Sequence, residues 1–149
     1  RLDKYATQAQ VLKEELLLLI EEDAEAFNVV MQAFRSPKKT KEDKERRLKK
    51  IEDSYKKAVY PPTLILEKSH KLLNIINKIH RKISSNCMSD LGVSVEMASA
   101  SINGAIMNIN INLKEISDRK FVSSVNKKVR KINKDVDDYL FKLNKDIEL

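Results

Sequence analysis

The chain has 149 residues, of which 42% are apolar and 34% charged, and it carries a formal net charge of +7. This balance excludes an intrinsically disordered chain and suffices for one ordinary domain with its own core. Because β-rich folds need many turn residues, the presence of only two glycines and three prolines predicts a single all-α domain over residues 1–149, a bundle of about five long helices.

The first predicted helix runs from about Leu2 to Phe34, because apolar residues recur there at steps of three and four. The stripe consists of Leu2, Ala6, Ala9, Leu12, Leu16, Leu19, Ile20, Ala26, Phe27, Val30 and Phe34. Asp23 falls inside this stripe, and a carboxylate that loses hydration there is suited to acid–base chemistry. The alternative is that Asp23 turns to the rim of the stripe or pairs with a lysine of another helix.

The second helix is predicted over residues 41–59, after the break at Ser36-Pro37. Thr40 is expected to cap it, with Asp43 as the capping-box partner three residues later. One side of this helix is expected to be buried, formed by Leu48, Ile51, Tyr55 and Ala58 or Val59. The rest of the helix is highly charged, so it should pack on one side only.

Residues 35–57 hold 11 basic and 5 acidic residues, a local charge of +6. The basic side chains around the first connection are Lys38, Lys39, Lys41, Lys44, Arg46 and Arg47. Such a cluster could receive a polyanionic ligand; the alternative is a solvated, lysine-rich helix face. Aromatic residues are too sparse to interleave with these charges as stacking platforms, so no nucleic-acid partner is expected.

Pro61-Pro62 is expected to break the second helix, and a third follows over about residues 63–83. The loop after it holds Cys87, the single cysteine, which excludes an intrachain disulfide and fits a reducing, cytoplasmic compartment. Ser89 or Asp90 is expected to cap the next helix. No Cys/His cluster has the spacing of metal ligands, so no metal is expected.

The fourth helix, residues 89–113, is predicted to be apolar on two faces. One stripe is Val93, Met97, Ser101, Gly104, Met107 and Ile111, and the other is Ala98, Ile102, Ala105, Ile109, Leu113 and Ile116. Two stripes need two covering surfaces, so we expect a central helix and a homodimer or higher homo-oligomer. Glu96 and several amides along the segment argue against a membrane-spanning helix.

Four asparagines interrupt this apolar segment, and Asn108 and Asn112 lie one turn apart on one face. Buried amides need hydrogen-bond partners, so these two side chains either bond to neighbouring helices or form a polar strip along a ligand cleft. A fifth helix follows from about Asp118 to Ile147, with its own apolar stripe of Phe121, Val125, Val129, Ile132, Val136, Tyr139 or Leu140, Leu143 and Ile147.

Three segments resemble the cyclodeaminase domain of formiminotransferase-cyclodeaminase and the stand-alone methenyltetrahydrofolate cyclohydrolases of the same family. The first is "IEEDAEAFNVVMQAFRSPKKTKEDKERR", residues 20–47, which is similar to a family stretch of the form D-A-E-A-F/Y followed by R-x-P-K. The second is "AVYPP", residues 58–62, and the third is "SDLGV…NGAIMNININL", within residues 89–113. The matches keep their order over about residues 10–120.

The resemblance implies an all-helical, dimeric domain that binds folate between helices. It implies that 5-formimidoyl-tetrahydrofolate is cyclised to 5,10-methenyl-tetrahydrofolate with release of ammonia, a lyase reaction, or that methenyl- and formyl-tetrahydrofolate are interconverted, a hydrolase reaction. The family's catalytic aspartate corresponds to Asp23. The substrate, a tetrahydrofolate derivative that can carry a glutamate tail, would contact Phe27, Lys38, Arg46, Arg47, Asp90, Asn108 and Asn112.

Two features depart from the family pattern. Nothing in the chain matches the Gly-rich loop and helix with which family members begin, and Ser36 stands where leucine is usual before Pro37. The first departure leaves a non-catalytic helical oligomerisation or interaction module as the alternative function.

Overall fold

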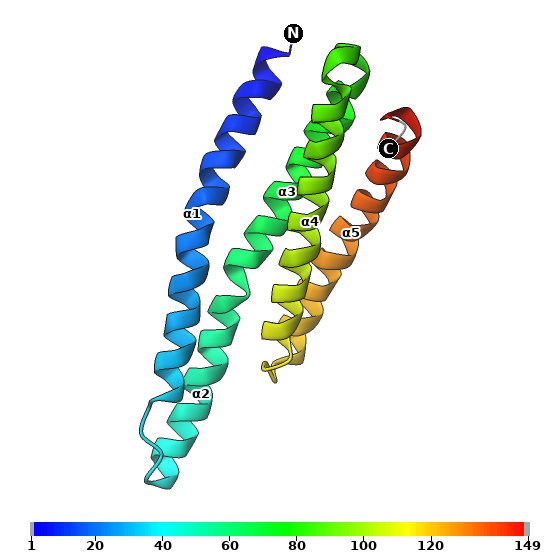
Figure 1. Ribbon diagram of the computed structural model, residues 1–149. Coiled ribbons are helices and arrows are strands. Elements are labelled where there is room, and N and C mark those ends of the chain that lie inside the picture. The colour runs from blue at the N-terminus through cyan, green and yellow to red at the C-terminus, as the bar shows by residue number, and fades with distance from the viewer. Residues whose placement is uncertain (1, 148–149) are drawn as a thin grey trace.

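The computed structural model describes residues 2–147, which form helices and no strand (Figure 1). Five α-helices make up the bundle: α1 (Asp3–Phe34), α2 (Lys41–Ala58), α3 (Tyr60–Ile79), α4 (Met88–Leu113) and α5 (Arg119–Ile147). Two short 3₁₀ turns, η1 (His80–Lys82) and η2 (Ser85–Cys87), connect α3 to α4. The predicted all-α class is confirmed.

The helix at the centre of the bundle is α3, which contacts α1, α4 and α5. Figure 1 shows α1 and α4 running in one direction, with the α2–α3 rod and α5 running in the other. Leu66 and Leu73 of α3 have no exposed surface, and the Oγ of the buried Ser69 lies 2.8 Å from the Oγ of Ser101 on α4. The prediction that the fourth helix is central is therefore wrong for the single chain.

Helices α2 and α3 are separated by Val59 alone, so they form an almost continuous rod. Pro61 and Pro62 occupy the first turn of α3, where a helix needs no N–H donor, and both are buried. The Thr63 hydroxyl donates to the Val59 carbonyl at 2.7 Å. The prediction that the prolines separate two helices by a break is wrong, because they start α3 without turning the chain.

The corner between α1 and α2 is closed by side-chain hydrogen bonds. Thr40 and Asp43 form the predicted capping box, with bonds of 3.0 and 3.2 Å. The Nε and Nη2 atoms of Arg47 both donate to the Phe34 carbonyl at 3.1 Å, which satisfies an acceptor that the end of α1 would otherwise leave open. Leu48, predicted to be buried, is 65% exposed, because this half of α2 extends past the ends of α4 and α5.

Helix α1 packs against α2 and α3 through only part of its predicted stripe. Leu12, Leu19 and Val30 are buried, and Ala33 joins them. Ile20, Phe27 and Phe34 are exposed, contrary to the prediction of one continuous buried stripe. The apolar surface of α1 is thus wider than the two helices that cover it.

The two stripes of α4 have different surroundings. Ala98, Ile102, Ala105, Ile109 and Leu113 are buried, as predicted, and Ile116 continues them after the helix. In the other predicted stripe, Val93, Met97, Met107 and Ile111 are exposed by 62–70%, whereas Ser101 and Gly104 are half-buried. The predicted caps Ser89 and Asp90 lie inside the first turn, because the helix begins one residue before them at Met88.

Helix α5 presents its predicted stripe to the core, with Val129, Ile132, Val136 and Leu143 buried. The side chain of Ile147, which also belonged to the predicted stripe, lies outside the described residues. No helix among residues 2–147 combines the length and apolar composition that crossing a membrane requires.

Candidate active site

A cavity of about 390 Å³ lies between α1, the end of α2 and the second half of α4. Four residues singled out from the sequence line it: Asp23, Phe27, Asn108 and Asn112. The other lining residues are Val30, Met31, Phe34, Tyr55, Ala58, Ile111 and Glu115. The fold therefore brings together side chains that are more than 80 positions apart in the sequence.

The α1 wall of the cavity carries Asp23 at one end and apolar side chains along the rest. Phe27, Met31 and Phe34 follow Asp23 at steps of four, four and three residues, which places all four on one helix face. Asp23 is half-buried, and no ion pair within residues 2–147 involves its carboxylate. Asp23 therefore does not pair with a lysine of another helix, which was one of the alternatives to a catalytic role. It lies at the rim of an open cavity.

The two asparagines of the α4 wall have different surroundings. The Nδ2 of Asn112 donates to the Ala58 carbonyl at 3.0 Å, and this acceptor comes from the last residue of α2. Asn108, one turn earlier, is exposed and lines the cavity. The hydrogen bond of Asn112 therefore links α4 to α2, as a polar side chain between helices does. Asn108 presents its amide to the cavity.

Tyr55 and Glu115 are lining residues that sequence reasoning did not assign to a site. The Tyr55 ring meets the Phe34 ring edge to face, with centroids 6.3 Å apart. Burial raises the pKa of Tyr55, and the nearby negative charge of Glu115 raises it further. Tyr55 was expected only to be buried, and the one signal for Glu115 was its place three residues after Asn112.

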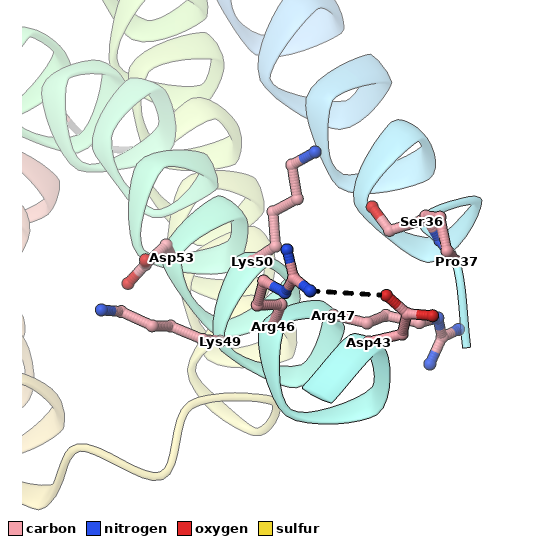
Figure 2. Close-up of a pocket in the computed structure, with 8 residues that line it drawn as sticks. All are labelled: Ser36, Pro37, Asp43, Arg46, Arg47, Lys49, Lys50 and Asp53. Atoms are coloured by element: carbon pink, nitrogen blue, oxygen red, sulfur yellow. Dashed lines mark ion pairs between the residues drawn. The ribbon is translucent and has the colours of Figure 1, made fainter. Parts of the chain in front are cut away.

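A second cavity, of about 430 Å³, lies at the α1–α2 corner (Figure 2). It is lined by Ser36, Pro37, Asp43, Arg46, Arg47, Lys49, Lys50 and Asp53. The predicted ligand-binding residues Arg46 and Arg47 are among them, whereas Lys38 is not. Lys49 and Lys50 also line this cavity. The sequence pattern did not indicate them, because it placed the basic cluster around the α1–α2 connection and these two lysines lie farther along α2.

The charges of this corner are partly neutralised within the protein. Arg46 pairs with Asp43, with its Nη2 3.7 Å from the carboxylate (Figure 2). Hydrogen bonds from Thr40 lower the pKa of Asp43. The Arg47 guanidinium lies 5.5 Å from the Phe34 ring centre and is bonded to the Phe34 carbonyl. Phe34 therefore contacts Arg47 at the corner and Tyr55 at the first cavity.

Asp90 is not brought into either cavity. It is exposed in the first turn of α4, 18 residues before Asn108, which corresponds to about 27 Å along the helix axis. A single small molecule in the first cavity does not reach it within this chain.

The family model described as formiminotransferase-cyclodeaminase matches residues 1–131. The chain belongs to this family. The resemblance carried by the three sequence segments is thereby confirmed, and so is the general class of folate one-carbon proteins of the cyclodeaminase and cyclohydrolase type.

Curated relatives in the family carry both names. The formimidoyltransferase-cyclodeaminase of Gallus gallus is 33% identical over 119 residues, which are 80% of this chain and 22% of that protein. The methenyltetrahydrofolate cyclohydrolase of Methylorubrum extorquens is 32% identical over 114 residues, 76% of this chain and 55% of that protein. The chain thus spans about a fifth of the first relative and about half of the second.

The formiminotetrahydrofolate cyclodeaminase of Thermotoga maritima has a similar solved structure. The TM-score is 0.76 at 24% sequence identity, over 91% of this chain and 65% of that one. This similarity shows that the helical bundle is the fold of the family.

Proposed function

We propose that this chain is a folate-dependent catalytic domain with its active site in the cavity of Asp23. Its reaction is either the cyclisation of 5-formimidoyl-tetrahydrofolate with release of ammonia or the interconversion of methenyl- and formyl-tetrahydrofolate. The observation that carries the proposal is that Asp23, Phe27, Asn108 and Asn112 line one cavity in a chain of this family. A non-catalytic module, the alternative function, is favoured by none of these observations.

Asp23 acts as the general base and then the general acid. In the cyclisation, N10 attacks the formimidoyl carbon, and the Asp23 carboxylate takes the proton from N10 as the new C–N bond forms. The former imino nitrogen receives this proton from Asp23 and a second proton from solvent, the C–N bond to that nitrogen breaks, and ammonia leaves. A positioned carboxylate of this kind contributes on the order of 10²–10⁴-fold to the rate.

The hydrolytic reaction uses the same carboxylate with water as the nucleophile. Asp23 takes a proton from the water as the water oxygen adds to the methenyl carbon, and gives it to the ring nitrogen as the C–N bond to that nitrogen breaks. The added hydroxyl releases its remaining proton to solvent and becomes the formyl carbonyl. Both reactions need a half-buried carboxylate beside the one-carbon unit, which is why Asp23 is common to them. The two reactions differ in the molecule exchanged at the one-carbon unit, because ammonia is released in the cyclisation and water is added in the hydrolysis.

The cellular form of the enzyme is proposed to be a cytoplasmic homodimer or higher homo-oligomer. The uncovered stripe of α4, Val93, Met97, Met107 and Ile111, supports self-association, because contiguous exposed apolar surface is unusual on a monomer. The basic corner is proposed to receive a glutamate tail on the substrate.

The decisive experiment replaces Asp23 in the full-length protein. Asp23→Asn keeps the size of the side chain and removes its acid–base function, so turnover should fall by at least about 100-fold while the circular dichroism spectrum is unchanged. Glu22→Gln is the matched control, because Glu22 is an exposed neighbour on α1 that does not line the cavity. Turnover of Asp23→Asn within threefold of wild type in both reactions would exclude Asp23 from the mechanism.

A further inference from the structure

The cavity carries one carboxylate toward each of its ends. Asp23 lies 11 residues before Phe34 on α1, which corresponds to about 16 Å along the helix axis. Glu115 follows the last turn of α4, and α4 runs in the same direction as α1 (Figure 1). Asp23 and Glu115 therefore approach the cavity from opposite ends.

Glu115 is grouped with the aromatic end of the cavity. Tyr55 contacts the Phe34 ring at 6.3 Å, and the charge of Glu115 is near enough to affect the ionisation of Tyr55. Asn112, three residues before Glu115, is bonded to Ala58, three residues after Tyr55. These contacts place the rings of Phe34 and Tyr55 and the carboxylate of Glu115 together.

The Glu115 carboxylate forms no ion pair and no side-chain hydrogen bond within the described part of the chain. None of the ion pairs or side-chain hydrogen bonds within residues 2–147 uses its oxygens. By contrast, Glu52 on α2 accepts the backbone N–H groups of Ser117 and Asp118. Glu115 is thus a free acceptor pair beside an apolar aromatic surface.

The pterin ring of a folate matches this arrangement chemically. Its N3–H and 2-amino groups are two adjacent donors that point the same way, as the N–H groups of a guanidinium do. A carboxylate accepts such a pair with its two oxygens. The faces of the fused ring are flat and aromatic, and they stack on or meet the edges of phenyl and phenol rings.

We propose that Glu115 binds the N3–H and 2-amino edge of the pterin, so that the ring lies along the cavity and its reacting nitrogens point toward Asp23. This assignment rests on the proposed function and specifies which part of the substrate each end of the cavity holds. From Asn108 to the end of α4 at Leu113 the wall is five residues, or about 7.5 Å, long, and Glu115 lies two residues farther on. A fused ring with a hydrogen bond of about 3 Å at either end spans a length on the order of 10 Å.

The test pairs a change in the ligand with a change in the protein. Calorimetric titration measures binding of 5-formyl-tetrahydrofolate, a stable folate, and of its 2-desamino-2-methyl counterpart, which lacks the donor. The full-length wild-type protein should prefer the parent folate by about 10- to 100-fold, the range of a hydrogen bond to a charged group. Glu115→Gln should weaken binding of the parent by about tenfold or more and weaken binding of the analogue, which keeps only the N3–H donor, by less.

Glu96→Gln is the control, because Glu96 is an exposed carboxylate on α4 that does not line the cavity. It should keep the wild-type preference. Equal affinity of the wild-type protein for both ligands, or an unchanged preference in folded Glu115→Gln, overturns the role of Glu115 and leaves the proposed function standing. Absence of binding of either ligand to the wild-type protein removes the proposed function and this assignment with it.

Discussion

His70 has two contacts with α5 that act on its protonation in opposite directions. Its ring stacks on Tyr139, with centroids 5.7 Å apart, and its Nε2 is buried without a hydrogen-bond partner among the described residues. The carboxylate of Asp135 lies 3.6 Å from the same atom. Burial lowers the pKa of His70 below 6.5, and the charge of Asp135 offsets part of that effect.

A lowered pKa in the folded state makes the free energy of unfolding depend on pH. His70 is protonated more readily in the unfolded chain than in the folded one. Its contribution to the free energy of unfolding is therefore fully present above pH 6.5 and is lost as the pH falls through the lower folded-state pKa. Each unit of difference corresponds to about 1.4 kcal/mol. Urea unfolding between pH 7 and pH 5 should therefore show a smaller loss of stability for His70→Gln than for the wild-type protein.

The comparison of the two proteins isolates His70, because all other titrations are common to both. Equal pH slopes would mean that the environment of His70 does not disfavour its charge. A steeper slope in the variant would mean that the Asp135 carboxylate outweighs burial.

At the scale of the element, helical periodicity predicted which residues share a face but not how far neighbouring helices cover that face. The buried stripes of α4 and α5 were predicted correctly, because α3 lies along both of them. Leu48 on α2 and Ile20 on α1 fit their stripes equally well, yet both are exposed beyond the edge of the packing helix. Where a packing helix stops covering its neighbour depends on where the helices end and on the angle between them. A local sequence pattern does not contain this information.

The same limit applies to the site. Asp23 and the pair Asn108 and Asn112 were visible as polar residues in apolar surroundings, which is a local signal. Tyr55 and Glu115 sit in ordinary amphipathic positions, and only the packing of α2 beside α4 gives them a shared cavity. Asp90 is the opposite case. It belongs to the same sequence segment as Asn108 and Asn112, yet its position in the first turn of α4 is far from the cavity.

The basic face of α2 leads to a prediction for substrate with a glutamate tail. Arg46, Arg47, Lys49 and Lys50 line the corner cavity, and Arg47 is also hydrogen-bonded to the Phe34 carbonyl. A penta-glutamyl substrate should therefore have a lower KM than the mono-glutamyl form at low salt. Each exposed contact contributes about 0.2–1 kcal/mol, and salt should reduce the difference.

An Arg46→Ala/Lys50→Ala double variant should lose most of this difference while its turnover stays near wild type. An Arg46→Ala/Arg47→Ala double variant should lose it as well, but with lower thermal stability, because Arg47 also caps α1. Identical KM values for the two tail lengths in the wild-type protein at low salt would exclude tail binding at this corner.

For the whole molecule, the uncovered stripe of α4 predicts self-association. Met97, Met107 and Ile111 are each exposed by more than 60%, and a Cβ at Gly104, between them, would meet no atom within 4 Å beyond its chain neighbours and its own helix backbone. Sedimentation at micromolar concentration should show at least a dimer. Met107→Lys should shift the protein toward monomer without loss of helical content, because Met107 is 69% exposed in the single chain.

Lys114→Met serves as a control that changes an exposed residue next to the end of the helix. It should leave the sedimentation coefficient unchanged. A wild-type protein that is monomeric throughout the micromolar range would contradict the assignment of this stripe as a subunit contact.

A bend at Val59, the joint between α2 and α3, would move the far end of α2 more than its near end. Helix α2 has 18 residues, about 27 Å, so a bend of about 10° at the joint displaces its far end by roughly 5 Å. Tyr55 is about one turn from the pivot and moves by only about 1 Å in the same bend. In such a bend the basic corner follows a charged tail, and the two hydrogen bonds from Arg47 to the Phe34 carbonyl carry the end of α1, with the Phe34 side of the cavity, along with that motion.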